Sequence, residues 1–397
     1  MRILYLADIR FPLERANGVQ TFETCRALAA RDHQVTLFVR RDTTSPARDP
    51  WQFYGAARDD RLTIVTAPWT PAALRRPSYV MLATMRALQR APDVVLTRDL
   101  GIADLLLSPP FGSLRTPLVY ESHGYAPAVA VELPRLLSTA TPPSARRLAR
   151  LTRRERRVWR RAQGYVTLTR VHQQELEDRF GTRLNAAVIP DGVRADLLAD
   201  DPGPVPEGDP PLVVYAGHLY PWKGVDVLIE ALAHLPGVHA RIVGGQPGET
   251  VDRDRLEARA RELGVADRVT FTGWVPPAAV RDELVRARVL VLPNRRTHIS
   301  DRYTSPLKLF EYMAAGRPIV ASDLHALREV LRHDENALLV APDSPAALAE
   351  ALRRLIDDRE LSRRLAQRAR QDAAEYGWDT RALRIEGVLD RAAGAEA

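Results

Sequence analysis

The chain has 397 residues, of which 45% are hydrophobic and 27% are charged, and its formal net charge is +7. This is the composition of an ordinary globular protein, and the length is sufficient for two domains with large cores. Because no run of eighteen apolar residues is free of charge, and the start Met1 to Asp8 is too short for a signal peptide, we expect a cytoplasmic protein.

Short apolar runs alternate with helical patterns through the first half of the chain. The runs that we interpret as strands are Arg2 to Ala7, Gln34 to Val39, Leu62 to Ala67, Val94 to Thr97, Leu118 to Glu121 and Tyr165 to Thr169. Helical patterns between several of them indicate a doubly wound parallel sheet. The one cysteine, Cys25, lies in the helical pattern Val19 to Ala30, where we expect a small core residue rather than a disulfide or a metal ligand.

Two residues of this half are candidates for a ligand site. Gly18 lies in the stretch Phe11 to Gln20, which we interpret as a loop between a strand and a helix. A glycine there either lets the backbone approach a ligand or makes a plain tight turn. His123 directly follows a predicted strand and precedes Gly124. A lone histidine is usually structural, but ligands bind beyond the carboxyl ends of parallel strands, so this position favours a residue of the cleft.

The positive charge is concentrated in one helical pattern, Arg146 to Arg161. It holds nine arginines against the single acid Glu155, a local charge of +8, so the rest of the chain is near −1. Its apolar residues form one stripe: Leu148, Leu151, Val158 and Ala162, with Trp159 beside it. Two interpretations stay open, a surface helix with solvated arginines or a helix that docks on the anionic inner face of a membrane. No aromatic strand platform or zinc spacing accompanies it, which argues against nucleic acid as a partner.

A proline-rich acidic segment, Asp200 to Pro211, precedes a second series of strands. These are Leu212 to Ala216, Ala240 to Val243, Val269 to Phe271, Val289 to Leu292, Ile319 to Ala321 and Ala337 to Val340. The chain is therefore predicted to form two Rossmann-like, doubly wound α/β domains, residues 1–185 and 186–375, that face a central cleft. We expect a C-terminal helix, residues 376–397, to pack back on the first domain.

The stretch Ser300 to Asp323 is typical of an anion site at a helix start. Ser305 can cap a helix whose first residue is Pro306. Exposed N–H groups and the helix dipole favour phosphate at such a start, and Lys308 adds a mobile positive charge. Glu311, one turn further on, can accept hydrogen bonds from ribose hydroxyls. The set predicts a site for a nucleoside diphosphate.

That stretch resembles the donor-binding motif of the family 4 retaining glycosyltransferases, which have the GT-B fold and use nucleotide sugars. Five further segments resemble family motifs, in the family's order: Tyr120 to Gly124, Ile189 to Val193, Tyr215 to Leu232, Val243 to Gly245 and Phe271 to Val275. The resemblance runs from Met1 to about Trp378. It implies that the first domain binds the acceptor and the second binds the donor.

The resemblance also implies individual site residues. The catalytic ones are His123, Lys223 and Glu311. Those expected to bind the donor are Gly18, Gly217, His218, Lys223, Gly245, Val275, Tyr303, Ser305, Pro306, Leu307, Lys308 and Glu311. Two of them depart from the family pattern: His218 replaces a phosphate-binding arginine, and Tyr303 replaces the first of two paired glutamates. The identity of the sugar therefore cannot be carried over.

By resemblance, we expect transfer of a sugar, with retention, from a nucleotide-diphosphate sugar to a hydroxyl of a glycan, a lipid-linked acceptor or a small molecule. Cations and helix N–H groups can neutralise the leaving diphosphate, so we expect neither a metal nor a cofactor. The one Asp-X-Asp sequence, Asp252 to Asp254, is explained more simply as a helix start. The alternatives are a nucleotide-sugar epimerase of the same fold and a non-enzymatic protein that binds nucleotide sugars or membranes.

Overall fold

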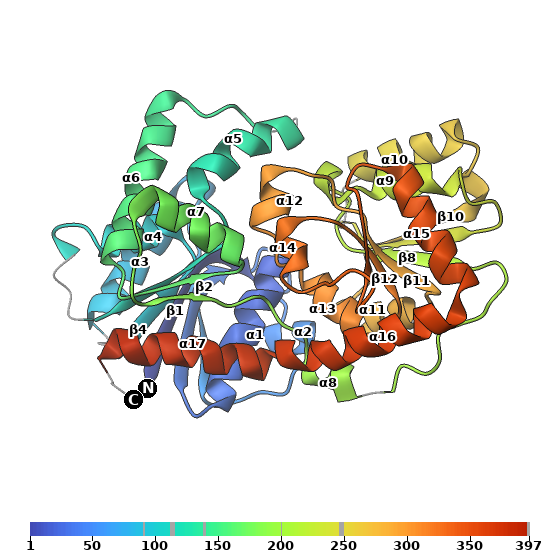
Figure 1. The fold of residues 1–397 in the computed structure, drawn as a ribbon. Coiled ribbons are helices and arrows are strands. Elements are labelled where there is room, and N and C mark those ends of the chain that lie inside the picture. The colour runs from blue at the N-terminus through green and yellow to red at the C-terminus, as the bar shows by residue number, and fades with distance from the viewer. Residues whose placement is uncertain (90–91, 112–115, 138–139, 200, 246–249, 395–397) are drawn as a thin grey trace. The chain divides into compact units, whose positions relative to one another are not determined.

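The computed structural model describes the chain except for residues 90–91, 112–115, 138–139, 200, 246–249 and 395–397 (Figure 1). The chain forms two compact units. Unit 1 comprises Met1–Val131, Pro142–Asp191 and Trp378–Ala397, and unit 2 comprises Glu132–Thr141 and Gly192–Gly377. Asp200 of the proline-rich segment and residues 395–397 of the expected C-terminal helix lie outside the described residues.

A seven-stranded parallel sheet forms the centre of unit 1, in the order β3-β2-β1-β4-β5-β6-β7. Its strands are β1 (Arg2–Phe11), β2 (Gln34–Arg41), β3 (Leu62–Ala67), β4 (Val94–Thr97), β5 (Leu118–Ser122), β6 (Gly164–Thr167) and β7 (Ala186–Val188). Helices cover both faces, which is why β4 is buried along its whole length instead of alternating. β7 pairs with β6 and carries the first sheet beyond the boundary expected at residue 185.

Unit 1 has helices on both faces of this sheet. They are α1 (Ala16–Ala30), α2 (Pro50–Tyr54), α3 (Arg75–Gln89), α4 (Leu100–Leu106), α6 (Ala145–Arg161), α7 (Arg170–Phe180) and α17 (Trp378–Ala393), with α5 (Ala126–Leu136) divided between the units. Right-handed crossovers place α1 on one face, where α17 packs beside it, and α3, α4, α6 and α7 on the other (Figure 1). Cys25 is buried in α1, as expected.

α17 comes last in the sequence and is fastened to unit 1 by ion pairs. Glu386 pairs with Arg31, and its other carboxylate oxygen lies 2.9 Å from Nε2 of His33. Nearer the start of the helix, Arg381 donates a hydrogen bond to Glu121 of β5 at 2.7 Å. The C-terminal segment is thereby an integral part of the first sheet domain.

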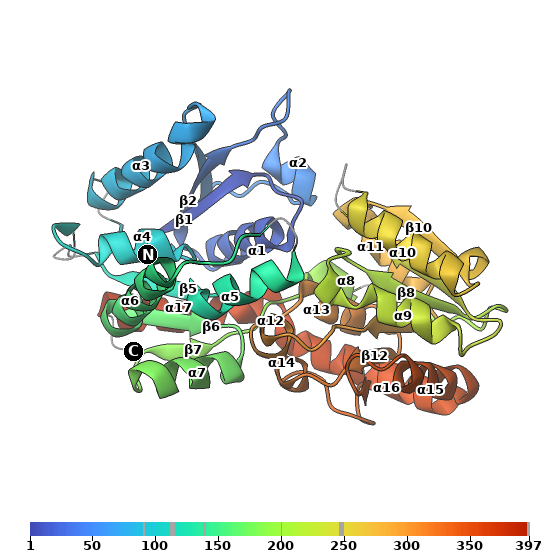
Figure 2. The ribbon, with the colours of Figure 1, turned by 90° about the horizontal axis from the view of Figure 1, so that it is seen from above.

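Unit 2 holds a six-stranded parallel sheet in the order β10-β9-β8-β11-β12-β13 (Figure 2). Its strands are β8 (Leu212–Ala216), β9 (His239–Val243), β10 (Val269–Gly273), β11 (Val289–Leu292), β12 (Ile319–Ser322) and β13 (Leu338–Val340). Its helices are α8 (Ala195–Ala199), α9 (Val225–Leu232), α10 (Val251–Glu262), α11 (Pro277–Val285), α12 (His298–Arg302), α13 (Leu307–Ala314), α14 (His325–Arg328), α15 (Pro345–Asp357) and α16 (Arg359–Ala373). Alternate residues of β8 enter two separate cores, Val213 and Tyr215 on one face and Val214 and Ala216 on the other.

Candidate functional site

The loop that follows β8 in unit 2 leaves room for Lys308. Gly217 has a φ of 141°, and a Cβ atom there would lie 3.4 Å from both Cδ and Nζ of Lys308. The hydroxyl of Tyr215 donates a hydrogen bond to the carbonyl of His218 at 2.5 Å, and Nζ of Lys308 lies 3.8 Å from the centre of the Tyr215 ring. Glycine at position 217 is thus favoured by its backbone conformation and by the close lysine.

Lys308 is a buried cation, with 9% of its surface exposed. Its ammonium makes no hydrogen bond within the described part of the chain. Burial, together with the positive charge of Lys223, holds the pKa of Lys308 well below its usual value, and the carboxylate of Glu311 opposes that shift. The cation–π contact with Tyr215 offsets only part of the desolvation. An anion that reached Nζ would supply the missing partner.

Lys223 ends a short 3-10 turn, η3 (Pro221–Lys223), directly before α9. Gly224 follows with a φ of 69°, and a Cβ atom there would lie 1.8 Å from the carbonyl oxygen of Pro293, after β11. The turn is therefore pressed against the neighbouring loop, which fixes the backbone that carries Lys223. Burial lowers the pKa of Lys223 to about 8.

Lys223 and Lys308 are the two lysines of the chain, because the other members of its 57 lysine and arginine residues are all arginines. Lysine differs from arginine in having a compact ammonium that loses its proton readily when it is buried, whereas a guanidinium stays charged. A chain that uses arginine everywhere else thus keeps lysine at two adjoining positions of one site. The residue count alone could have pointed to both.

The helix start next to Lys308 differs from expectation. α13 begins at Leu307 and Pro306 is its N-cap, with φ −78° and ψ 126°, so Ser305 is not the cap and Pro306 is not the first helical residue. The reason is that Pro306 keeps an extended ψ, and its carbonyl accepts the first helical hydrogen bond, from Leu309 N at 2.8 Å. No side-chain hydrogen bond caps this start, which keeps first-turn N–H groups available to an anion.

Glu311 lies one turn into α13 and is half-buried. Burial raises the pKa of its carboxyl, while the positive charges of Lys308 and Arg194 oppose that rise. Unit 2 therefore brings Lys223, Lys308 and Glu311 close enough for their charges to act on one another. Two cations and one carboxylate beside a helix start can hold a diphosphate and a hydroxyl-bearing group together.

The two residues that depart from the family pattern both contact other side chains of unit 2. The ring of His218 lies against Tyr220, with centroids 5.2 Å apart, and Tyr220 stacks on Trp222. Tyr303 is buried, and its hydroxyl lies 2.9 Å from Nε2 of His298. These contacts give both residues a packing role, and their contacts with a donor stay predictions.

Two further donor-binding candidates follow strands of unit 2. Gly245 comes after β9 with a φ of 117°, a conformation that side chains rarely adopt. Val275 comes after β10 and packs, partly buried, against one of the two cores. Both have structural reasons for their residue type, and their role in a ligand site stays a prediction.

In unit 1, His123 follows β5 and contacts Glu121 two residues earlier. Nε2 of His123 lies 2.8 Å from Oε1 of Glu121. Burial and the positive charge of Arg98 lower the pKa of His123 to about 4, although Glu121 pulls it upward. The imidazole is therefore neutral at pH 7, which suits it to hydrogen bonding rather than to proton donation.

Gly18 was expected in a loop, and that expectation is wrong. α1 begins at Ala16, so Gly18 lies in the first turn of the helix and is buried. A Cβ atom at this position would lie 2.4 Å from the carbonyl oxygen of Leu13 and 2.5 Å from the hydroxyl of Tyr54. Glycine is needed here because the preceding loop and α2 pack tightly against the helix.

Four polar residues around His123 were not predicted. They are Gln20 of α1, Arg98 after β4, Glu121 of β5 and Arg381 of α17. One signal was present in the sequence: Glu121 is the only carboxylate in β5, a strand that is buried along its whole length. Such a residue requires paired donors, and the sequence alone does not show which segments supply them.

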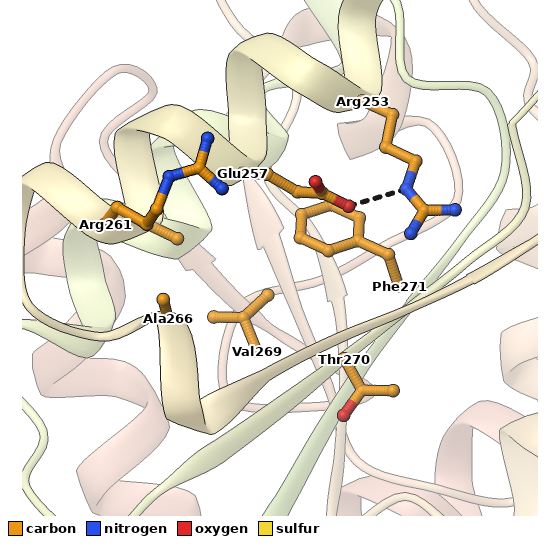
Figure 3. Close-up of a pocket in the computed structure, with 8 residues that line it drawn as sticks. Arg253, Glu257, Arg261, Ala266, Val269, Thr270 and Phe271 are labelled. Carbon is orange, nitrogen blue, oxygen red and sulfur yellow. Dashed lines mark hydrogen bonds and ion pairs between the residues drawn. The ribbon is translucent and has the colours of Figure 1, made fainter. Parts of the chain in front are cut away.

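A pocket of about 340 Å³ lies in unit 2 between α10 and β10 (Figure 3). Its charged lining comprises Arg253, Glu257 and Arg261, and Phe271 closes one side. Arg253 and Glu257 pair at 2.6 Å, and no predicted site residue lines the pocket. Within the described ranges, histidine, cysteine, aspartate and glutamate side chains form no group of three that could hold a metal ion.

Two family models match the chain in succession. "Glycosyltransferase Family 4" matches residues 18–197, and "Glycosyl transferases group 1" matches residues 200–372. The D-inositol 3-phosphate glycosyltransferase of Acidothermus cellulolyticus is 30% identical over an alignment of 423 positions, gaps included, that covers 98% of this chain and 89% of that protein. Its namesake from Xylanimonas cellulosilytica is 31% identical over 255 residues, 60% of this chain, and the match spans only 59% of that protein's length.

Other matches are more distant or more partial. The GDP-mannose-dependent alpha-(1-6)-phosphatidylinositol monomannoside mannosyltransferase of Mycobacterium tuberculosis is 30% identical over 53% of this chain and 57% of its own. Among solved structures, sucrose-phosphate synthase from Thermosynechococcus elongatus has a TM-score of 0.78 at 21% identity and covers both chains fully. Anabaena HepE, in complex with UDP and glucose, has a TM-score of 0.73 at 20% identity over 98% of this chain and 99% of its own. At such identities the structures establish the GT-B fold alone.

The two lysines allow a direct test of the site's electrostatics. In protein labelled with ¹³C at lysine Cε, the two signals should titrate with midpoints near pH 8 for Lys223 and well below 10.5 for Lys308. Because the lowered pKa values mean that the charged forms are disfavoured, inorganic pyrophosphate should raise both midpoints. Its affinity should fall as the pH rises through about 8. Midpoints near 10.5 that pyrophosphate leaves unchanged would contradict this arrangement.

Proposed function

The chain belongs to the group 1, family 4 glycosyltransferases, and from that premise we propose that it transfers a sugar, with retention, from a nucleotide-diphosphate sugar to a hydroxyl acceptor. The observation that carries the proposal is the buried ammonium of Lys308, which has no hydrogen-bond partner among the described residues and adjoins an α13 start without a side-chain cap. Lys223 adds a second cation. This is the charge that a departing diphosphate requires.

The geometry supports a division of roles within the donor site. The lysines and the first-turn N–H groups of α13 hold the diphosphate, and Glu311 accepts hydrogen bonds from the ribose. The Mycobacterium relative is named for GDP-mannose, and the Anabaena protein was crystallised with UDP, which supports a nucleoside diphosphate without choosing the base. His123, neutral and partly exposed, contacts a sugar or acceptor hydroxyl. The acceptor attacks on the face from which the phosphate leaves, without a covalent enzyme intermediate, a metal or a cofactor.

A lipid surface is the second part of the proposal. Seven of the nine arginines of α6 are exposed, while Arg154 and Arg157 pair with Asp104 of α4. The single acid of the helix, Glu155, is buried and accepts a hydrogen bond from the backbone N–H of Ala126 at 2.9 Å. The outer charges of α6 are therefore all positive, which suits anionic lipid headgroups. No helix in the described part of the chain is long and apolar enough to cross a bilayer.

A second helix on the same face of the sheet exposes apolar side chains. Met81, Met85 and Leu88 lie along the outer face of α3, and Leu74 and Trp69 precede it, with 69% of Trp69 exposed. α3 and α6 both approach α4, since a Cβ atom at Gly101 would lie 3.2 Å from Nη2 of Arg76 and 3.9 Å from Nη1 of Arg154. An apolar ridge beside a cationic helix fits the boundary between headgroups and acyl chains. The names of relatives that act on inositol phosphate and phosphatidylinositol mannoside are compatible with a lipid-linked acceptor.

Nucleotide release tests the reaction. With UDP-glucose or GDP-mannose as donor and inositol 3-phosphate or phosphatidylinositol vesicles as acceptor, UDP or GDP should form only when donor and acceptor are both present. An epimerase would convert the donor sugar without an acceptor, and a binding protein would bind the donor and release nothing. Either of those outcomes, across the donors and acceptors tried, would replace the transferase proposal.

Substitutions in the donor site distinguish the residues that bind the diphosphate from the residue that binds the ribose. Lys223→Met and Lys308→Met should weaken UDP or GDP and pyrophosphate alike, about ten- to a hundredfold, because each loses a charge-assisted contact. Glu311→Gln should weaken the nucleotides but not pyrophosphate, which has no ribose. Isothermal titration measures all three, with Arg261→Met as the control, since it removes an exposed cation of unit 2 that lines the α10–β10 pocket. If Arg261→Met lowered the affinities as much as the lysine substitutions, the losses would be explained by the change in net charge and not by contacts in the donor site.

Binding to anionic vesicles should have a salt-sensitive part, due to the arginines of α6, and a salt-resistant part, due to the apolar side chains of α3. Changing four exposed arginines of α6 to glutamine (Arg150, Arg153, Arg156 and Arg160) should lower binding to anionic vesicles at least about tenfold, since each arginine contributes about 1 kcal/mol or less. Met81→Gln with Met85→Gln should remove the part that survives high salt, together with quenching of Trp69 by brominated lipid. The control changes four exposed arginines of α16 (Arg359, Arg363, Arg364 and Arg368) and should leave binding unaltered. Equal binding by all variants would favour the solvated interpretation of α6.

A further inference from the structure

We propose that Glu121 is a positioning residue for His123: its carboxylate fixes the imidazole as the Nε2–H tautomer, so that Nδ1 is left to accept a hydrogen bond from a hydroxyl of the bound sugar or acceptor. The inference rests on the proposed function, because it assigns a partner to the same histidine. It goes beyond that proposal by naming the protonated nitrogen and the residues that determine it.

Glu121 receives three hydrogen bonds on a single oxygen. Its Oε1 accepts from Nε2 of Gln20 at 2.5 Å, from Nη2 of Arg381 at 2.7 Å and from Nε2 of His123 at 2.8 Å. The Arg381 guanidinium and the other donors hold the pKa of this buried carboxyl well below its usual value. An ionised carboxylate can only accept, so the histidine nitrogen that faces it must carry the proton.

The partners of Glu121 are themselves fixed. The amide oxygen of Gln20 accepts a hydrogen bond from Nη1 of Arg98 at 2.5 Å, which turns the amide nitrogen of Gln20 toward Glu121. Arg381 donates to the carbonyl of Pro190 at 3.0 Å and to Oγ1 of Thr24 at 2.9 Å. Hydrogen bonds from segments far apart in the sequence thus fix the carboxylate of Glu121. The carboxylate in turn fixes the ring of His123 through its own hydrogen bond.

His123 itself is suited to accept a hydrogen bond. Its side chain is 23% exposed, so the ring can be reached from outside. Within the described part of the chain its imidazole makes one hydrogen bond, the one through Nε2. The charged or titratable groups that act on it are Glu121 of β5, Arg98 after β4, Arg381 of α17 and His172 of α7, and with burial they keep it neutral from pH 8 to about pH 5. A neutral ring whose Nε2–H is engaged offers the lone pair of Nδ1 to a hydroxyl.

The tautomer can be read directly from ¹⁵N-histidine NMR of the full chain, without any nucleotide or sugar. The signals that His123→Gln removes should report Nε2–H and bare Nδ1 at pH 7, unchanged down to about pH 5. Glu121→Gln, whose amide can donate as well as accept, should give mixed tautomers. It should also lower kcat about ten- to a hundredfold while donor KM stays within about twofold.

Two further variants separate positioning from stability. Glu386→Gln removes the ion pair of α17 with Arg31 and alters its contact with His33 but leaves Glu121 intact, so the tautomer and kcat should both be preserved. Glu121→Gln combined with Arg381→Gln removes both buried charges together, which provides a folded test if the single variant unfolds. It should show the same mixed tautomers and the same loss of kcat.

Each outcome decides the proposal. A charged His123, or an Nδ1–H tautomer, in the native protein at pH 7 overturns it, as does full kcat in either folded Glu121 variant. Failure of the function proposed above looks different: UDP and GDP would not bind the native chain or would not be released, while the tautomer signals would be as expected. The two failures are therefore distinguishable in one set of samples.

Discussion

A buried ammonium without a hydrogen-bond partner among the described residues is the feature around which the candidate site of unit 2 is arranged. Lys308 lies against the Tyr215 ring, and two glycines with positive φ keep its surroundings open: Gly217 leaves space for the side chain, and Gly224 lets the Lys223 turn press on Pro293. Burying a charge in this way destabilises the empty protein, and an arriving anion relieves that cost. Stability and ligand binding are therefore opposed at this one atom, which is typical of a functional site.

The buried charge of unit 1, on Glu121, differs from that of Lys308 because it has hydrogen-bond partners within the protein. Glu121 is more deeply buried than Lys308, yet it receives three hydrogen bonds, one of them from Arg381, whose guanidinium also donates to Thr24 and Pro190. Three donors on Oε1 hold the Glu121 side chain in place, although its Oε2 has no hydrogen-bond partner among the described residues. The two halves thus use buried charge for different purposes. Under the two proposals above, unit 1 uses it to orient His123 and unit 2 uses it to bind an anion.

The sequence predicted what depends on short-range pattern. Strands such as Leu212–Ala216 and Val289–Leu292 were found with their observed bounds, because continuous apolar runs between helices mark buried parallel strands. Prediction from the sequence failed where a feature depends on contacts between segments that are distant in the sequence. Gly18 looked like a loop glycine, but the close approach of Leu13 and Tyr54 explains it, and three-residue β7 exists only through its pairing with β6. Arg381 could not be matched to Glu121 from sequence, since 260 positions separate them.

The preference for lysine at positions 223 and 308 follows from the same balance of burial and charge. An arginine at position 308 would remain protonated in the empty site, so its full desolvation would have to be met without a counter-charge. The guanidinium of arginine is also larger than an ammonium and would come too close to the backbone at Gly217. A Cβ atom built at Gly217 would already lie only 3.4 Å from Nζ and Cδ of Lys308. Lysine avoids both costs, because it can give up its proton when the site is empty and regain it when an anion binds. The other members of the chain's lysine and arginine set are all arginines, and burial lowers the pKa of both lysines.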